Sequence, residues 1–204
     1  MSAQSQPRLT PEQYLELERA ALDVRSEYYN GRMYAMSGGS YPHAIVIGNL
    51  GGELRMALKK GPCVVTNSDM RVRVNKTGLY TYPDIVVVGN SPQFEDDDHD
   101  TLLNPTLILE VLSTSTEAYD RGFRSIQYRT LESLQEYALV SQSQPSVEIF
   151  RRQPSGEWIF SESVGMQAVC RFDSVGCTVA MKDIYDKVTF EGEAAIADRP
   201  SPAV

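Results

Sequence analysis

Two apolar stretches, each with one acidic residue, decide how this sequence is interpreted. The first is "YTYPDIVVVGN", residues 80–90, in which Asp84 directly precedes four β-branched residues. The second is "NPTLILEVLSTST", residues 104–116, in which Glu110 interrupts an apolar run. Short apolar runs of this kind are typical of buried strands. Because a carboxylate inside such a strand is costly unless it is paired or binds a metal, the two stretches predict a site on neighbouring core strands.

Length and composition predict one globular domain with a substantial core, since the chain has 204 residues and is 42% hydrophobic. Residues 1–9 and 191–204 lack periodicity and are expected to be disordered tails, which leaves residues 10–190 as the domain. No apolar run is long enough to cross a bilayer and no signal peptide is recognisable, so we expect a cytoplasmic protein that does not bind membranes. The three cysteines lack C-x-x-C spacing, which indicates neither a disulfide framework nor a zinc knuckle.

The net charge of -8 argues against broad, nonspecific nucleic-acid binding, which needs a cationic surface. Basic residues nevertheless cluster at positions 71–76 and 121–129, so a local basic patch is compatible with the sequence. The acidic segment "EDDDHD", residues 95–100, lacks EF-hand spacing and is interpreted as a solvated loop. An acidic chain can also carry clustered carboxylates that a divalent cation neutralises.

The predicted elements alternate between helices and strands. A first helix begins after Thr10, which with Pro11 and Gln13 forms a capping-box pattern. A β-hairpin follows, turning at Asn30-Gly31. Further helices are predicted at residues 43–59, 117–130 and 179–188, and strands at 63–66, 70–74, 84–88, 106–112, 136–142, 146–152 and 158–163. This order predicts an α/β (α+β) fold with a mixed central sheet flanked by helices and the two apolar runs in its middle.

The two acidic residues suggest a metal site. If their strands are neighbours, the carboxylates of Asp84 and Glu110 can point at one place. Hard oxygen ligands suit Mg²⁺ or Mn²⁺, which bind substrate phosphates and activate water. For each residue there is a structural alternative: Asp84 can cap a turn, and Glu110 can pair with a buried arginine.

Pro83-Asp84 followed by Glu110-Val111-Leu112 resembles the PD-(D/E)xK motif of restriction-endonuclease-like nucleases. More closely, the chain resembles the Uma family of restriction-endonuclease-like proteins, a domain of unknown function. The matching stretches run in the family's order over about residues 10 to 190: "SEYYNGRMYAMSG", "HAIVIGNL", "NSDMRVRV", "YTYPDIVVV", "NPTLILEVLSTSTEAYDRG" and "YRTLESLQEYALVSQ". The resemblance implies a restriction-endonuclease-like core and a metal held by Asp84, Glu110 and the carbonyl of Val111. It also implies that Asp69 is a polar cleft residue and a further metal ligand, for which a turn or cap residue is the alternative.

The resemblance further implies that Glu27 supplies an acidic group and that His43 orients a water or contacts phosphate. For His43 the alternative is a helix residue satisfied by a neighbour. The chain departs from the superfamily pattern at Leu112, where a lysine is usual. Family members place a lysine on the following helix, and here Arg124 takes that position in "DRGFR". Arginine stabilises phosphate charge but does not readily release a proton, and a solvent-facing arginine is the alternative.

We therefore expect a Mg²⁺- or Mn²⁺-dependent endonuclease that hydrolyses DNA phosphodiester bonds, with Arg124 as the cationic partner of the carboxylates. The alternative is a nuclease fold kept as a binding or assembly module without turnover. A hydrolase for a small phosphorylated molecule suits the acidic charge but has no motif behind it. A homodimer is expected because cutting both strands of a duplex often pairs two active sites. The choice between DNA and RNA and any recognition sequence stay open.

Overall fold

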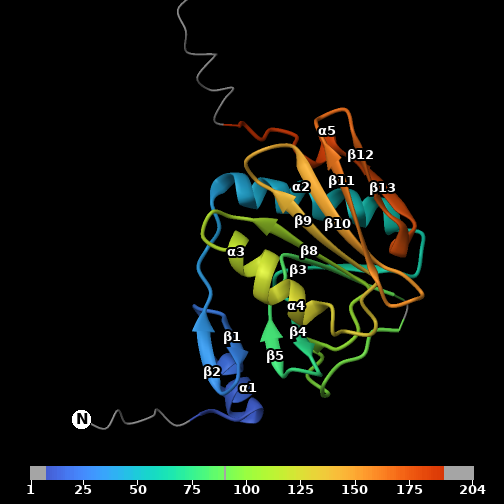
Figure 1. Ribbon diagram of the computed structural model, residues 1–204. Helices are drawn as coiled ribbons and strands as arrows, with labels where there is room; N and C mark the ends of the chain where they lie inside the picture. Colours follow the sequence, from blue (N-terminus) through green and yellow to red (C-terminus); the bar gives the residue numbers. More distant parts are fainter. Residues whose placement is uncertain (1–7, 90, 191–204) are drawn as a thin grey trace, which may run out of the picture.

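The computed structural model describes residues 8–89 and 91–190, and a mixed six-stranded sheet lies at the centre of this part of the chain (Figure 1). Its strands, in spatial order, are β11 (Trp158–Val164), β10 (Ser146–Arg152), β9 (Glu136–Ser141), β8 (Leu107–Leu112), β6 (Ile85–Val88) and β3 (Val64–Asn67). Strands β8 and β9 are parallel, and the other neighbours are antiparallel. The two apolar runs form β6 and β8, which are neighbours as predicted; both are interior strands, but β6 lies next to the edge strand β3 and not in the middle of the sheet. The fold class is therefore the expected α/β (α+β) class.

A second sheet lies below the first in the view of Figure 1 and carries the N-terminal hairpin. Its strands, in spatial order, are β2 (Arg32–Ala35), β1 (Ser26–Tyr29), β5 (Leu79–Thr81), β4 (Arg71–Val74) and β7 (Thr101–Leu102). The predicted turn is confirmed, since Asn30 has φ 50° and Gly31 has φ 81°, the two positive angles that a type I′ turn needs. Strand β5 and the hairpin of β12 (Val169–Phe172) and β13 (Cys177–Ala180) were not predicted.

The first two long helices begin close to their predicted positions. Helix α1 (Pro11–Ala20) has the capping box, in which the Thr10 hydroxyl accepts a hydrogen bond from the Gln13 backbone N–H. Helix α2 (Tyr41–Leu58) begins two residues before the prediction because Ser40 is its N-cap. A short 3-10 turn (Asp173–Val175) and helix α5 (Met181–Ile184) lie near the end of the described chain.

The helix predicted at residues 117–130 is interrupted. Helix α3 (Glu117–Tyr119) leads into a π-helical turn (Asp120–Arg124), and α4 (Ser125–Tyr128) follows. Such turns insert an extra residue into a helix and are frequent at functional sites. Here both ends of the turn are buried, with Asp120 1% and Arg124 8% exposed. The alternative of a solvent-facing Arg124 is therefore wrong.

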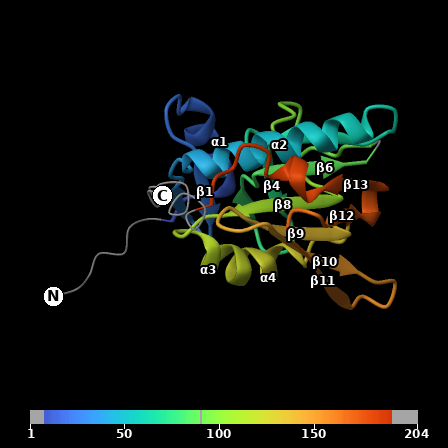
Figure 2. The ribbon, with the colours of Figure 1, turned by 90° about the horizontal axis from the view of Figure 1, so that it is seen from above.

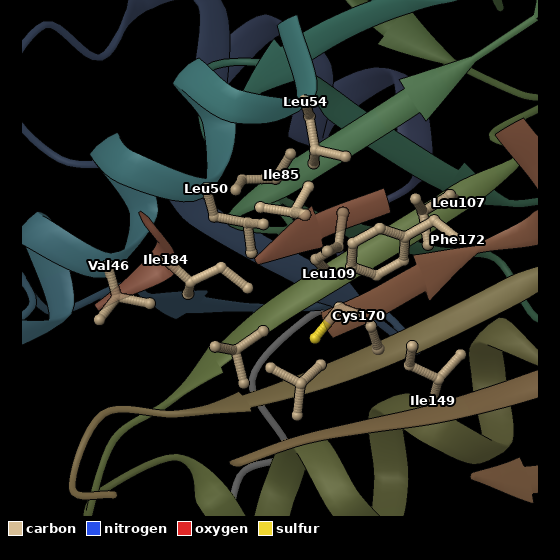
Figure 3. Packing of buried hydrophobic residues seen from close by; sticks show 14 of the residues in the cluster. Val46, Leu50, Leu54, Ile85, Leu107, Leu109, Ile149, Cys170, Phe172 and Ile184 are labelled. Carbon is tan, nitrogen blue, oxygen red and sulfur yellow. The ribbon is translucent and has the colours of Figure 1, made fainter. Parts of the chain in front are cut away.

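Hydrophobic clusters cover both faces of the central sheet. Figure 2 shows α2 on one side of β8 and β9, and α3 and α4 on the other. Under α2, Leu50 and Leu54 point toward Ile85 and Leu109 of the sheet (Figure 3). On the opposite face Tyr128 of α4 belongs to a second cluster of buried residues. Because both faces are covered, β6 and β8 are apolar at every position except Glu110.

The predicted tails fall mostly on residues 1–7 and 191–204, which lie outside the described residues. Leu9 is described, and its backbone N–H donates a hydrogen bond to the carbonyl of Gly31 at 3.0 Å. Within residues 8–89 and 91–190, no helix has both the length and the apolar character needed to cross a membrane.

Candidate active site

The pairing of β6 with β8 brings Asp84 and Glu110 together. Ile85 faces Leu109 in this antiparallel pair, so the same register continued by one step sets Asp84 opposite Glu110. The backbone N–H of Asp84 donates a hydrogen bond to Glu110 Oε2 at 3.2 Å. The backbone N–H of Val111 donates one to Asp84 Oδ2 at 2.8 Å. Each carboxylate is thus held by the strand that carries the other, which fixes their relative position.

Glu110 is more deeply buried than Asp84, with 1% of its surface exposed. Its Oε1 accepts a hydrogen bond from the Tyr128 hydroxyl at 2.8 Å and lies 3.1 Å from Arg124 Nη1. Burial raises the pKa of Glu110 well above its usual value; the charge of Arg124 opposes this rise, and the neighbouring charges of Asp84 and Asp120 add to it. The protein surroundings therefore favour the protonated form of Glu110, even though Arg124 is close by.

Arg124 lies at the centre of a cluster of acidic side chains. Its Nη2 is 2.6 Å from Glu27 Oε1, and its Nη1 is 2.9 Å from Asp120 Oδ1 and 3.1 Å from Glu110 Oε1. Burial by itself lowers the pKa of Arg124, but the charges of Glu110, Glu27 and Asp120 outweigh it and raise the pKa well above the ordinary value. The guanidinium therefore stays charged, and it cannot act as a general base.

Glu27, on β1, forms the outer side of this cluster and is 5% exposed. Its Oε1 accepts hydrogen bonds from Arg124 and from the Thr81 hydroxyl. Its Oε2 accepts one from the Tyr119 hydroxyl at 3.0 Å. The structure thus joins Glu27 to Glu110 through Arg124, and it does not bring the Glu27 carboxylate into contact with Asp84.

His43 approaches Asp84 from the first turn of α2. Its Nε2 lies 3.4 Å from Asp84 Oδ2. Burial by itself lowers the pKa of His43, but hydrogen bonding to Asp84, the charge of Asp84 and a hydrogen bond to the backbone of Val111 outweigh it, so the pKa is raised. The ring fits because residue 39 is glycine: a Cβ there would lie 2.4 Å from His43 Nδ1.

Asp69 lies apart from the cluster. Its carboxylate pairs with Arg25, and its side chain is 64% exposed. It lines the same cavity as Asp84 and His43, so a role for Asp69 in metal binding stays a prediction.

The acidic loop is not simply solvated, contrary to the interpretation of its sequence. Asp96, Asp98 and Asp100 surround Arg19 of α1, with oxygen–nitrogen distances of 2.7, 2.8 and 2.8 Å. Asp100 also lies 2.8 Å from Arg71. The loop therefore holds α1 against the second sheet.

Three cavities that share lining residues open around the cluster in the described part of the chain. The largest, about 850 Å³, and a central one of about 290 Å³ share His43 and Asp84. The central cavity shares Arg124 with a third, of about 410 Å³. Residues 36 and 37, in the loop before α2, line all three. The cavities therefore surround Asp84 and Arg124 on the side of this loop.

Sequence reasoning missed three residues of the cluster: Asp120, Tyr119 and Tyr128. Asp120 had a signal in the sequence, because it opens the "DRGFR" segment and lies four residues before Arg124. Tyr128 follows Arg124 by four residues, a spacing that places both on one face of a helix. Tyr119 had no comparable signal, since its contact with Glu27 spans 92 residues of sequence.

The residues around Asp84 fit a magnesium-like cation. Among the described residues no group of three or more His, Cys, Asp or Glu side chains is arranged to hold a metal. The candidate donors are the carboxylates of Asp84 and Glu110, each hydrogen-bonded to the backbone of the other's strand, near Val111. One or two carboxylates are the donor set that Mg²⁺ commonly uses, with waters and substrate phosphate as its other ligands. The donor chemistry therefore fits Mg²⁺ or Mn²⁺.

Three comparisons with known proteins place this geometry in context. The family model described as "Uma2: Putative restriction endonuclease" matches residues 11–173. Two uncharacterized proteins of Synechocystis are similar: slr1290 is 34% identical over 90% of this chain and 95% of its own length, and sll1609 is 33% identical over 80% and 92%. A solved structure from Anabaena variabilis, described as "a putative nuclease belonging to DUF820", has a TM-score of 0.68 and 15% identity. It covers 87% of this chain and 98% of that one, which shows a shared fold.

Proposed function

Because the chain belongs to the Uma2 family, we propose that it is a metal-dependent nuclease that hydrolyses phosphodiester bonds of DNA. The observation that carries the proposal is the pair of carboxylates, Asp84 and Glu110, opposed across β6 and β8 beside a cavity. The excess of acidic groups supports it. Three carboxylates, those of Glu27, Glu110 and Asp120, contact a single arginine, Arg124. A fourth, Asp84, is next to Glu110, because the backbone N–H of Asp84 donates to the Glu110 carboxylate. A divalent cation would supply the missing positive charge.

Asp84 and Glu110, with the carbonyl of Val111, would hold the cation. Bound there, Mg²⁺ or Mn²⁺ would lower the pKa of a water and stabilise negative charge on the scissile phosphate. The surrounding protein keeps both carboxylates in place. The Tyr128 hydroxyl and Arg124 fix the orientation of Glu110, and the Val111 N–H fixes that of Asp84.

His43 is the residue placed to move a proton. Its Nε2 faces Asp84 Oδ2, and its side chain is 14% exposed in a cavity that also contains Asp84. A histidine in such a position can exchange a proton with water in the cleft. Arg124 acts instead as a positioning residue, because all three of its carboxylate contacts lie within the protein.

The metal site can be tested by calorimetric titration with Mn²⁺. We compare the natural protein with Asp84→Asn and Glu110→Gln, which keep side-chain shape and remove the charge. Glu132→Gln, a change at an exposed acid outside the cluster, is the control. We expect both site variants to lose binding and the control to keep it. Isotherms that do not differ among the four proteins, with thermal melts showing that all are folded, would remove the metal site.

Cleavage is tested with Mn²⁺ on single-stranded, double-stranded and branched DNA. The proposal expects products from the natural protein and none from Asp84→Asn. The same assay with RNA tests the choice of DNA. If the double-stranded substrate is the one that is cut, we also propose a homodimer, because cutting both strands of a duplex often pairs two active sites. Sedimentation velocity would then show a species of twice the mass of the chain.

One observation favours a second function, a nuclease fold kept as a binding or assembly module. Arg124 stands where family members have a lysine, and it is bound by three carboxylates. Arg124→Lys discriminates between the two functions. If this variant gains cleavage that the natural chain lacks, the natural chain is the module; if the natural chain already cleaves, the module is excluded.

A further inference from the structure

The third cavity, of about 410 Å³, is walled by aromatic rings. Tyr119 and Phe123 stack with centroids 5.2 Å apart and an interplanar angle of 16°. Tyr29 meets Phe123 edge-on at 5.0 Å. Tyr34 on β2 completes the wall, and it is 48% exposed. Ligand cavities typically measure about 300–1,000 Å³, so this aromatic cavity is large enough for a small planar group.

The aromatic cavity adjoins the proposed nuclease site. Arg124 lines both the aromatic cavity and the central cavity that contains Asp84. Its guanidinium carbon lies 5.3 Å from the centre of the Tyr119 ring. The Arg124 side chain is about nine-tenths buried, and its Nε–H nevertheless has no acceptor among the described residues. The two cavities therefore share a charged side chain that lies between the proposed nuclease site and the aromatic rings.

The charges around the largest cavity argue against a binding mode based on phosphates. Its three arginines are paired with acidic groups: Arg19 with the acidic loop, Arg25 with Asp69 and Arg71 with Asp100. A duplex held by its backbone needs lysines and arginines that neutralise phosphates. Aromatic side chains, in contrast, stack on an unpaired base of any sequence.

We propose that the aromatic cavity holds an unpaired nucleobase, so that the strand at the nuclease site is single-stranded. The inference rests on the proposed function for the identity of the ligand as nucleic acid. It adds that bases, more than phosphates, hold the strand. A paired base inside a duplex has no free face for the rings and would not enter the cavity.

The test measures fluorescence anisotropy of labelled oligonucleotides in EDTA, where no cleavage occurs. The probes are a single-stranded thymidine oligonucleotide, a strand of the same length made wholly of abasic sites, and a duplex of the same length. The abasic strand keeps the phosphates and lacks the bases. We expect the natural protein to bind the thymidine strand at least about tenfold more tightly than either of the other two probes.

Variants at Tyr34 make the test specific. Tyr34→Ala is expected to weaken binding of the thymidine strand about 5- to 10-fold, within the range of one base–aromatic stack, and to leave binding of the abasic strand unchanged. Tyr34→Phe keeps the ring and is expected to bind as the natural protein does. The control is Phe160→Ala on β11, the far edge strand of the central sheet, where the ring is similarly exposed at 52%.

Three results would overturn the inference. The natural protein could bind the thymidine and abasic strands equally well, or bind neither. Alternatively, Tyr34→Ala could lose the same factor of affinity for both strands. The result is separate from that of the cleavage assay. A base-dependent binder that never cleaves retains the aromatic cavity as a base site and refutes the nuclease. A protein that cleaves but binds the thymidine and abasic strands equally retains the nuclease and refutes the base site.

Discussion

Replacing Arg124 with leucine is expected to cost roughly 3–5 kcal/mol of the free energy of unfolding at pH 8. Removing one partner of a buried ion pair costs about that much, because the remaining charge stays buried without compensation. The upper end applies here, since Arg124 contacts three carboxylates, at 2.6, 2.9 and 3.1 Å, and is 8% exposed. Leucine fills part of the volume, so the loss reflects charge more than a cavity.

The loss should depend on pH in a defined direction. Burial raises the pKa of both Glu110 and Asp120, and the charge of Arg124 opposes that rise. Without Arg124 both pKa values rise further, so the folded variant keeps protons that the unfolded chain has already released. Stability is then greatest below the pKa of the unfolded carboxyls and falls with rising pH, by about 1.4 kcal/mol per pH unit for each proton retained. The deficit at pH 5 should therefore be at least about 1.4 kcal/mol smaller than at pH 8.

Urea unfolding followed by circular dichroism, in EDTA at pH 5 and pH 8, measures both quantities. Arg121→Leu is the matched control in the same helical segment. Arg121 also contacts two carboxylates, at 2.6 and 2.7 Å, but its side chain is 37% exposed, so its loss should be at most about 1 kcal/mol. A deficit for Arg124→Leu below about 1 kcal/mol at pH 8, or one equal at both pH values, would refute the account of the cluster.

Three further predictions concern other parts of the molecule. Gly39→Ala places a Cβ 2.4 Å from Nδ1 of His43 and should displace the ring from Asp84. The raised pKa of His43 should then fall toward its ordinary value in an NMR titration of the two histidines. An unchanged titration would contradict this placement of the ring. The hydrogen bond from Arg19 lowers the pKa of Asp100, so Asp100→Asn should lower the free energy of unfolding at pH 7. In urea titrations this loss should shrink as the pH falls toward the lowered pKa of Asp100. A loss that is the same at every pH would show that the charge of Asp100 is not its cause. Leu50→Ala, at a fully buried position under α2, should cost about 2–5 kcal/mol in the same measurement, and a cost below about 1 kcal/mol would mean that α2 does not pack as described.

Local patterns predicted much of the fold because the forces that set them act over a few residues. The capping box at Thr10 joins groups three residues apart, and the Asn30-Gly31 turn needs only the two positive φ angles that these residues tolerate. The continuous apolar runs around Asp84 and Glu110 indicated strands covered on both faces. The π-helical turn was not predicted, because the sequence of these residues is equally compatible with an uninterrupted α-helix.

The apolar runs were enough to predict that Glu110 lies in a core strand and Asp84 at the start of one. They also predicted that each acid has a partner, because burying an unpaired carboxylate among apolar residues is too costly. The sequence by itself did not determine the partner. The register of β6 against β8 set Asp84 opposite Glu110, and the π-helical turn directed Arg124 inward to Glu27, 97 residues away. The same long-range packing left Asp69 with Arg25 instead of with Asp84. Contacts of this length depend on how whole elements pack, and no pattern of neighbouring residues encodes them.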